Sequence, residues 1–258
     1  MFQATILSFP WLIHAFTTRL GGVSEGVFAS LNLSFRVGDD PRRVLANRQR
    51  LAEALGYDPG RMVCGQQVHG VNVALVTPRE AGAGALTPET ALSSTDALVS
   101  DTPGLSLTAF FADCVPVVLA DKKNRAIGVV HAGWRGTAQE IPGRVLAKMS
   151  EAFGTQPADC VAVLGPAIGP CCYKVDETVA AAFSRWGTAV LFFEENRWHI
   201  DLWETNRQVL IRAGIDAGNI AVVKVCTACN PELMFSYRRD GGKTGRMAAV
   251  AMIKPEGV

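Results

Sequence analysis

The sequence of 258 residues predicts a mixed α/β protein. Short apolar runs rich in β-branched residues alternate with amphipathic helical segments, and several runs are apolar almost throughout, as in strands covered on both faces. Hydrophobic residues make up 48% of the chain and charged residues 19%, which is enough for a sizeable core. There is no internal repeat, and the only low-complexity stretch, residues 81–91, is typical of an exposed loop. We therefore expect one domain covering residues 1–258.

Two helices have clear start and stop signals. The first is predicted from Pro41, which suits the first position of a helix, to Leu55, because Gly56 fits the position after a helix end. The other is predicted to start at Asp201 and to end near Gly214. Both signals combine a capping or Pro residue at the start with a glycine at the end.

A further helix has an ambiguous start. Thr137 and Glu140 have the spacing of a capping box, but Pro142 sits badly inside a helix, so the start is predicted at either Thr137 or Pro142, with the end near Gly154. The strands are predicted from apolar, β-branched runs. These runs are residues 71–76, 105–111, 115–120, 126–130, 160–164, 189–193, 220–225 and 247–253.

Composition excludes several classes of protein. The formal net charge is +1 and the basic residues are dispersed, whereas a nucleic-acid-binding module normally carries a basic stripe, so we expect no nucleic-acid partner. No apolar run approaches the ~18 residues of a membrane helix, and the apolar start of the chain lacks a basic region and a cleavage site. Seven cysteines, an odd number, do not indicate a disulfide framework. We expect a cytoplasmic protein.

Three side chains stand out as possible metal ligands. His69 precedes a predicted strand, His131 follows the predicted strand 126–130, and Cys114 lies between two apolar strands. Such strand ends are where α/β proteins usually place their sites. Imidazole and thiolate are the preferred ligands of zinc, and three ligands with one open position are typical of a catalytic site. A small buried Cys and hydrogen-bonded structural histidines are the alternative, which the irregular spacing leaves open.

The motifs as a set resemble the YfiH-like family, formerly described as laccase-domain or polyphenol oxidase proteins. The resemblance extends over nearly the whole chain. Its blocks are Thr17–Ser24, Ser30–Leu33, Val37–Asp40, Asn47-Arg48, Gln66–Gly70, Thr95–Ala97, Ala112–Pro116, His131–Gly136, Gly165–Gly169, Cys171–Tyr173 and Phe235–Asp240. The blocks around Cys114 and His131 are the most specific.

The resemblance implies a fold, an activity and a metal. The fold is a four-layer αββα sandwich, and the activity is that of a zinc-dependent purine nucleoside phosphorylase that also deaminates adenosine. The substrates would be phosphate and the purine nucleosides adenosine, inosine, guanosine and methylthioadenosine. The two histidine ligands and the cysteine ligand of the family fall on His69, His131 and Cys114.

Other site residues are proposed from their chemistry within these blocks. Asp113, next to Cys114, is a candidate either for a proton-transferring carboxylate or for a group that orients the metal ligands, with a turn-capping role as the alternative. Arginine matches the oxygens of phosphate, so phosphate contacts are expected from Arg48 and Arg135 first. Arg19 and Arg238 are further candidates for phosphate, and the polar candidates for ribose or base are Asn32 and Gln67.

Aromatic residues and the remaining cysteines carry weaker signals. Trp134 and Phe235 could stack on a purine, although core packing is commoner for such residues. The pair Cys171-Cys172 and the Cys226-Thr227-Ala228-Cys229 motif together suggest a four-cysteine zinc site. We expect no such site, because adjacent cysteines rarely bind one tetrahedral ion and no second motif of this kind is present.

Two competing functions follow from the same residues. Laccase activity is rejected, because several copper ions require more histidines than the four in this chain. A cysteine- or metal-dependent amide hydrolase that edits peptidoglycan precursors remains open, since Cys114 with His69 or His131 could form a thiolate–imidazole pair.

Overall fold

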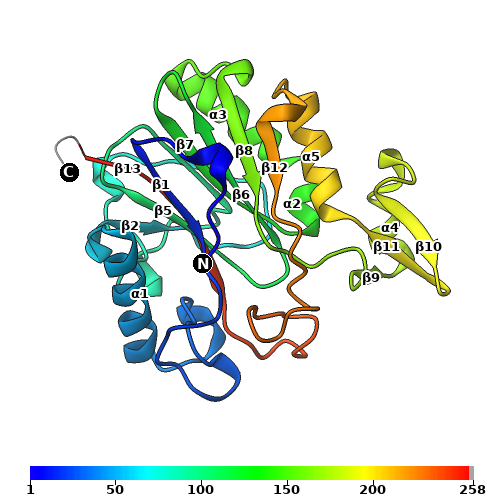
Figure 1. Ribbon diagram of the computed structural model, residues 1–258, viewed down its shortest axis with the longest axis horizontal. Coiled ribbons are helices and arrows are strands. Elements are labelled where there is room, and N and C mark those ends of the chain that lie inside the picture. Colours follow the sequence, from blue (N-terminus) through cyan, green and yellow to red (C-terminus); the bar gives the residue numbers. More distant parts are fainter. Residues whose placement is uncertain (256–258) are drawn as a thin grey trace.

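The computed structural model describes residues 1–255 and contains two central β-sheets (Figure 1). One sheet has four strands in the order β1-β13-β5-β2, and the other has six in the order β12-β8-β6-β7-β4-β3. The strands of the first sheet are β1 (Leu12–Phe16), β2 (Met62–Cys64), β5 (Ser106–Phe111) and β13 (Met247–Ile253). Those of the second are β3 (Val73–Leu75), β4 (Ala97–Ser100), β6 (Val115–Asp121), β7 (Ala126–Ala132), β8 (Cys160–Leu164) and β12 (Ile220–Val222).

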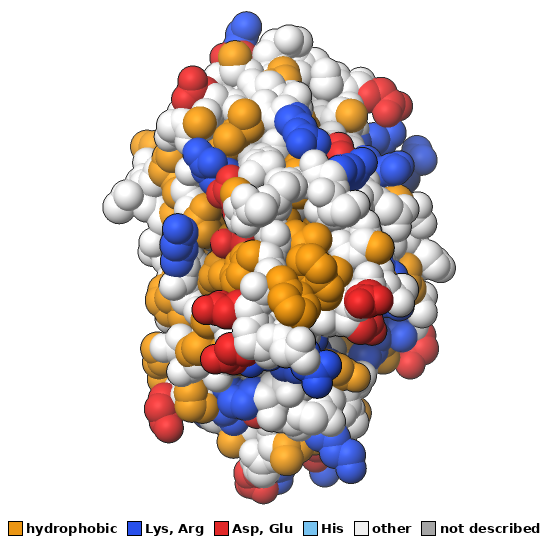
Figure 2. All heavy atoms as spheres, turned by 90° about the vertical axis from the view of Figure 1, so that its right-hand side faces the viewer, with side chains coloured by type: hydrophobic (Ala, Val, Ile, Leu, Met, Phe, Trp, Pro, Cys, Tyr) orange, Lys and Arg blue, Asp and Glu red, His pale blue; other side chains and the backbone are white. Residues whose placement is uncertain are grey.

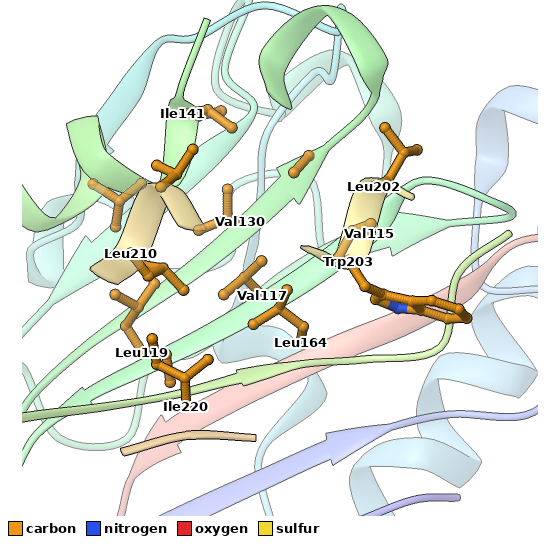
Figure 3. Close-up of a cluster of buried hydrophobic side chains, with 14 of the residues drawn as sticks. Val115, Val117, Leu119, Val130, Ile141, Leu164, Leu202, Trp203, Leu210 and Ile220 are labelled. Carbon is orange, nitrogen blue, oxygen red and sulfur yellow. The ribbon is translucent and has the colours of Figure 1, made fainter. Parts of the chain in front are cut away.

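Side chains along each strand point alternately to the two faces of the sheet, and their packing forms three hydrophobic layers. In β6, Val118 faces the other sheet and packs with Leu107 of β5, whereas Val117 points to the opposite side. That opposite side is covered by α3 (Ile141–Phe153) and α5 (Leu202–Arg212) (Figure 3). The outer face of the four-stranded sheet is covered by α1 (Pro41–Leu55). The predicted αββα sandwich is therefore confirmed.

A small third sheet projects from the sandwich. It consists of β9 (Lys174–Val175), β10 (Leu191–Glu194) and β11 (Arg197–Ile200), in the order β10-β11-β9, and is accompanied by the short helix α4 (Glu177–Ala181) (Figure 1). Figure 2 shows the molecule from this side, with hydrophobic side chains gathered near the middle of the face. Phe193 of β10 is exposed and packs edge-on against Trp198.

The two helices with clear signals form where the sequence predicts them. The side chain of Asp40 accepts a hydrogen bond from the N–H of Arg42 at the start of α1, and Gly56 has the left-handed conformation that ends it. At the start of α5, Asp201 accepts from the N–H of Glu204. These end signals act within one turn of the chain, so the local sequence is sufficient for them.

The helix start predicted from a capping box at Thr137 is wrong. Thr137 lies in a separate short helix, α2 (Trp134–Ala138), where its hydroxyl bonds to the carbonyl of Ala132. Asn206 of α5 donates to the same hydroxyl. The following helix α3 begins at Ile141, after Glu140 in a left-handed conformation without a side-chain cap. The tertiary contact with α5 therefore overrides the local capping pattern, and the alternative start at Pro142 is correct to one residue.

The other expectations differ from the structure in extent. The strand predicted for residues 126–130 continues to Ala132, so His131 lies inside β7. The stretch 81–91 is only partly exposed, because Ala85 is buried. Strands β1, β2, β4, β9 and β11 were not predicted. None of the helices in residues 1–255 is long and apolar enough to cross a membrane.

Candidate metal centre

Three potential ligands meet at one end of the sandwich. The ligand atoms of His69, Cys114 and His131 all lie within 4.8 Å of one another. The rings of the two histidines pack edge-on, with 4.9 Å between their centroids. His131 is buried, Cys114 is partly exposed and His69 is exposed, so one side of the group faces solvent. Two imidazoles and one thiolate with an accessible side fit zinc in an open, catalytic type of site.

The connections between the two sheets place two of these ligands. Cys114 lies in the turn by which the chain passes from β5 in one sheet to β6 in the other. His69 lies in the longer connection from β2 to β3, which makes the same passage. His131 is the penultimate residue of β7, the strand paired with β6. The site is thus built where the chain crosses between the sheets.

Asp96 holds two of the ligands in place. One oxygen of its buried carboxylate accepts hydrogen bonds from Nδ1 of His131, at 2.9 Å, and from the N–H of His69, at 2.9 Å. The other oxygen accepts from the N–H groups of Val68 and Gly70, at 3.1 and 2.8 Å. The bond to His131 fixes the proton on Nδ1 and leaves Nε2 as the ligand atom.

The charge distribution favours an ionised thiol. Burial by itself would raise the pKa of Cys114, but His131 and His69 outweigh it and lower that pKa to about 6. The pKa of His131 is raised to about 9, since the Cys114 thiolate and Asp96 outweigh its burial. Burial also opposes ionisation of Asp96, yet hydrogen bonds from His131 and the backbone lower its pKa. Thiolate is the form of cysteine that binds metals and acts as a nucleophile.

Gly133 leaves room for the ligands. A Cβ atom at this position would lie 2.7 Å from Cδ2 of His69 and 3.2 Å from Sγ of Cys114. The backbone of Gly133 is extended, with φ −70° and ψ 171°, so its conformation does not require glycine. The close approach of the ligands therefore explains the absence of a side chain here.

Strained backbone marks the two crossing connections. His69 and Asp113 both have positive φ angles, 59° and 90°, which residues other than glycine rarely adopt. The strain at Asp113 is balanced by two short hydrogen bonds to its carboxylate, from the hydroxyl of Thr227 at 2.6 Å and from the N–H of Arg238 at 2.7 Å. Strain held by surrounding contacts is characteristic of functional sites. These contacts are those of a positioning residue.

The three ligands line a cavity of about 870 Å³. This volume is in the range of pockets that bind small molecules, roughly 300 to 1,000 Å³. Its wall is strongly basic, because seven cationic side chains face two acidic ones. The cations are Arg36, Arg48, Arg135, Lys174, Arg197, Arg238 and Arg246, and the acids are Asp113 and Asp176. Asp176 also caps α4 by accepting from the N–H of Val179.

The proposed arginines lie in different environments. Arg135 and Arg238 are exposed on the cavity wall, and their guanidinium groups stack on Trp134 and Tyr173. Arg48 also reaches the wall but is only 3% exposed, and its Nε and Nη1 donate to the carbonyls of residues 33, 84 and 85. The position of Arg48 suits support of the wall better than contact with phosphate.

Other sequence candidates separate in the same way. Gln67 lines the cavity, and its side-chain amide pairs with both backbone groups of Phe110. Asn32 and Phe235 have no exposed surface and are not part of the lining of this cavity. Asn32 instead joins two segments by bonding to Asp39 and to the N–H of Arg246.

Two site residues were missed by the sequence reasoning. Asp96 lies in the family block Thr95–Ala97, but nothing in that block indicates a contact with the metal ligands. Arg246 lies outside the family blocks and is in the cavity wall just before β13. The pairing of β4 with β7 brings Asp96 to His131, so the contact joins residues that are 35 positions apart in sequence. A Gly-Arg pair ahead of a strand has no local feature that distinguishes Arg246 from a surface arginine.

Comparison with known proteins identifies the family of this chain. Residues 13–254 match the family model described as multi-copper polyphenol oxidoreductase laccase. The protein named purine nucleoside phosphorylase YlmD from Geobacillus stearothermophilus is 41% identical over 246 residues, covering 93% of this chain and 90% of that one. A protein named purine nucleoside phosphorylase from Deinococcus radiodurans is 43% identical over 238 residues, covering 92% and 87%.

The solved structures show the same relation in three dimensions. The crystal structure of YlmD from Geobacillus stearothermophilus superposes with a TM-score of 0.93 at 39% identity, covering 98% of this chain and 94% of that one. Because the match extends over nearly the full length in both sequence and structure, this chain belongs to the YfiH and YlmD family of laccase-like domain proteins.

Proposed function

We propose that this protein is a zinc-dependent purine nucleoside phosphorylase that also deaminates adenosine. It would cleave adenosine, inosine, guanosine and methylthioadenosine with phosphate, giving the free base and ribose 1-phosphate. The observation that carries the proposal is the open group of His69, Cys114 and His131 inside a basic cavity. The relatives named purine nucleoside phosphorylase at 36–43% identity support the reaction class.

The excess of positive charge supports phosphate as a substrate. An oxygen of phosphate would bond to C1′ of the ribose while the bond from C1′ to the base breaks, and the base would leave with the electron pair. Arg135, Arg238 and Arg246 all belong to the cavity wall. Their charge would concentrate and orient the dianion, since arginine offers paired donors to phosphate oxygens. We place the phosphate contacts on these three arginines.

The aromatic part of the wall supports a purine. Trp134 and the exposed Tyr237 both line the cavity. Each already has an arginine over its ring, Arg135 at 4.4 Å and Arg246 at 5.4 Å from the centroid. A purine base could stack on the part of either ring that its arginine leaves uncovered. Gln67, which also lines the cavity, would then be a polar contact for the base. This arrangement would place base, ribose and phosphate along one cavity.

The ligands and Asp113 would have separate roles. Zinc, when bound to His69, Cys114 and His131, would supply Lewis acidity and activate water for deamination. Asp96 would keep Nε2 of His131 available, and Asp113 would hold the crossing turn that carries Cys114.

The seven cysteines all have free thiols, which supports the cytoplasm as the compartment.

The laccase description of the family model does not extend to copper clusters in this chain. It has four histidines, and two of them are elsewhere. His14 accepts a hydrogen bond from the N–H of Ala4 through Nε2, and His199 is hydrogen-bonded to the carbonyl of Pro170. The remaining pair, with one thiolate, provides ligands for a single ion.

A second candidate function has one observation in its favour. Cys114, His131 and Asp96 form a series of thiol, imidazole and carboxylate, and the pKa of Cys114 is lowered. That order is the one used by nucleophilic cysteine hydrolases, so an amide hydrolase acting on peptidoglycan precursors is the alternative. The reaction of Cys114 with alkylating reagents distinguishes a zinc site from a free nucleophilic thiol. A free thiolate would react readily, whereas a metal-bound thiolate would react only after chelation of the metal.

Nucleoside turnover tests the proposal. Purified protein of known metal content would be incubated with adenosine or inosine, with and without phosphate, and the bases separated by chromatography. We expect phosphate-dependent release of adenine or hypoxanthine that is lost in Cys114→Ala. Bound zinc without any nucleoside turnover would refute the proposal and favour the amide hydrolase.

A further inference from the structure

Four cysteines outside the candidate centre lie together at the protein surface. Cys171 and Cys172 are in the loop after β8, and Cys226 and Cys229 are in the loop after β12. All four Sγ atoms lie within 4.8 Å of one another. Sγ of Cys229 is 3.6 Å from that of Cys171 and 3.3 Å from that of Cys172. We call this group the four-cysteine cluster.

The fold brings these loops together. Strands β8 and β12 are parallel neighbours, so the chain leaves both at the same edge of the sheet. Their pairing continues past the strands, because the N–H of Ala167 donates to the carbonyl of Val225 and the N–H of Thr227 donates to that of Ala167. Cys226 lies within this last pairing, opposite Ala167, and the other three cysteines follow within a few residues of it on the two loops.

The adjacent pair can face one point because the backbone turns there. The N–H groups of Cys172 and Tyr173 both donate to the carbonyl of Gly169, which closes a tight turn around residues 169–173. In an extended strand, by contrast, neighbouring side chains point to opposite faces and could not reach one ion together. The turn therefore removes the objection from adjacency, on which the expectation of no four-cysteine zinc site partly rested.

The distances and the exposure both point to a ligand. Four sulfurs at about 2.3 Å from a tetrahedral zinc ion are about 3.8 Å apart, close to the separations in the cluster. Cysteine that merely packs is usually buried, but Cys171 and Cys229 are exposed. The N–H of Gly169 donates to Sγ of Cys226 at 3.2 Å, as N–H groups do toward thiolates.

We propose that Cys171, Cys172, Cys226 and Cys229 bind a second metal ion, zinc, in a closed structural site. Binding would release the four thiol protons and leave four metal–sulfur bonds without an open position. The proposal does not depend on nucleoside turnover. It predicts two classes of metal in one chain, an open one at Cys114 and a closed one at the cluster.

The cluster would fix one wall of the cavity. Thr227, next to Cys226, donates to Asp113, whose backbone carbonyl accepts from the N–H of Ile168. On the other side of the cluster, Tyr173 and Lys174 line the cavity. A metal that ties the two loops together would hold the turn around Asp113 and the basic wall in register.

Metal analysis of the reduced, full-length protein tests the proposal. We expect two zinc ions per chain in the wild type, one in Cys114→Ala and one in Cys229→Ala. Cys160→Ala is the matched control, because it removes a buried thiol at the start of β8 and should leave both ions bound. Equal zinc content in the wild type and Cys229→Ala would overturn the proposal.

Cobalt gives a second measurement that needs no change in the cluster. In Cys114→Ala, the four-cysteine cluster is the one group within residues 1–255 that can supply several thiolates to a shared ion, so added Co²⁺ should give thiolate-to-cobalt charge transfer and the visible absorption of a tetrahedral site. Absence of these bands would refute the proposal even if Cys229→Ala failed to fold. A mass lower by two hydrogens in the metal-free protein would identify a disulfide instead and would equally overturn it.

Discussion

Asp96→Asn is the most informative perturbation of the metal centre. In the native site each carboxylate oxygen accepts two hydrogen bonds, one oxygen from His131 and the N–H of His69, the other from the N–H groups of Val68 and Gly70. An amide has one acceptor oxygen, so its NH2 group must face one of these two pairs of donors. Either the loop that carries His69 is pushed away, or His131 must move its proton to Nε2.

The expected loss follows from these contacts. Groups that orient metal ligands typically contribute roughly 10- to 100-fold in metal affinity, which is about 1.4 to 2.7 kcal/mol. The free energy of unfolding of the metal-free protein should fall by about 1 to 3 kcal/mol, because buried N–H donors lose their acceptor. We therefore expect zinc affinity and kcat/KM for phosphorolysis to fall together, while the four-cysteine cluster keeps its ion.

Competition with a chromophoric zinc chelator measures the affinity, and steady-state kinetics at saturating zinc measures the activity. Asp121→Asn is the matched control, since Asp121 is a fully buried carboxylate that also accepts backbone N–H bonds, at the far end of β6. The control should lose stability but keep zinc affinity. If Asp96→Asn bound zinc within twofold of the wild type, the assignment of Asp96 as the group that orients His131 would be refuted.

Three further predictions concern the same cavity. Gly133→Ala should lower zinc affinity at least tenfold, because its Cβ would lie 2.7 Å from Cδ2 of His69. Gly143→Ala in α3 is the control: its Cβ would make only an ordinary van der Waals contact, and the substitution should raise the free energy of unfolding by about 0.5 to 1 kcal/mol. Arg135→Ala should raise the apparent KM for phosphate about 10-fold or more through loss of a charged hydrogen bond, and Arg42→Ala, on the exposed start of α1, should not; an unchanged KM removes Arg135 from the phosphate site. Chelation should abolish turnover and lower the Tm by roughly 5 to 10 °C for each zinc ion that is normally present at about 100 times its Kd, and readdition of zinc should restore both. Cys114→Ala should have no turnover to restore, and chelation should lower its Tm only through loss of the ion in the four-cysteine cluster.

Elements with strong local signals could be predicted from the sequence. The helix 41–55 has a capping Asp, a Pro at its first position and a left-handed Gly at its end, and the structure reproduces both of its ends. The long apolar strands of the sheet centre were also located, because burial on both faces leaves a continuous apolar run. Short strands such as Met62–Cys64 have too few residues for a pattern, and they form because a neighbouring strand pairs with them.

Contacts between distant segments could not be predicted in this way. The role of Asp96 depends on the pairing of β4 with β7, and the four-cysteine cluster depends on the parallel pairing of β8 with β12. His69, Cys114 and His131 stand out as possible ligands by residue type and by their places at strand ends, but their spacing along the chain has no local regularity, and only the family resemblance selects them as one set. The environment of Arg48 could not be predicted either, since its place in a family block does not indicate that its Nε and Nη1 donate to backbone carbonyls.

The position of the centre explains why its connections are strained. A ligand placed on a strand would inherit the geometry of one sheet, but Cys114 and His69 must meet His131 from the passages between two sheets. Each passage carries a residue with positive φ, and each strained residue is held by a carboxylate, its own at Asp113 and that of Asp96 at His69. The carboxylates therefore act on the backbone as well as on the ligands. It follows that changes at Asp96 and Asp113 should displace the metal ligands before they unfold the sandwich, because most residues of its three hydrophobic layers lie on strands and helices rather than in these turns.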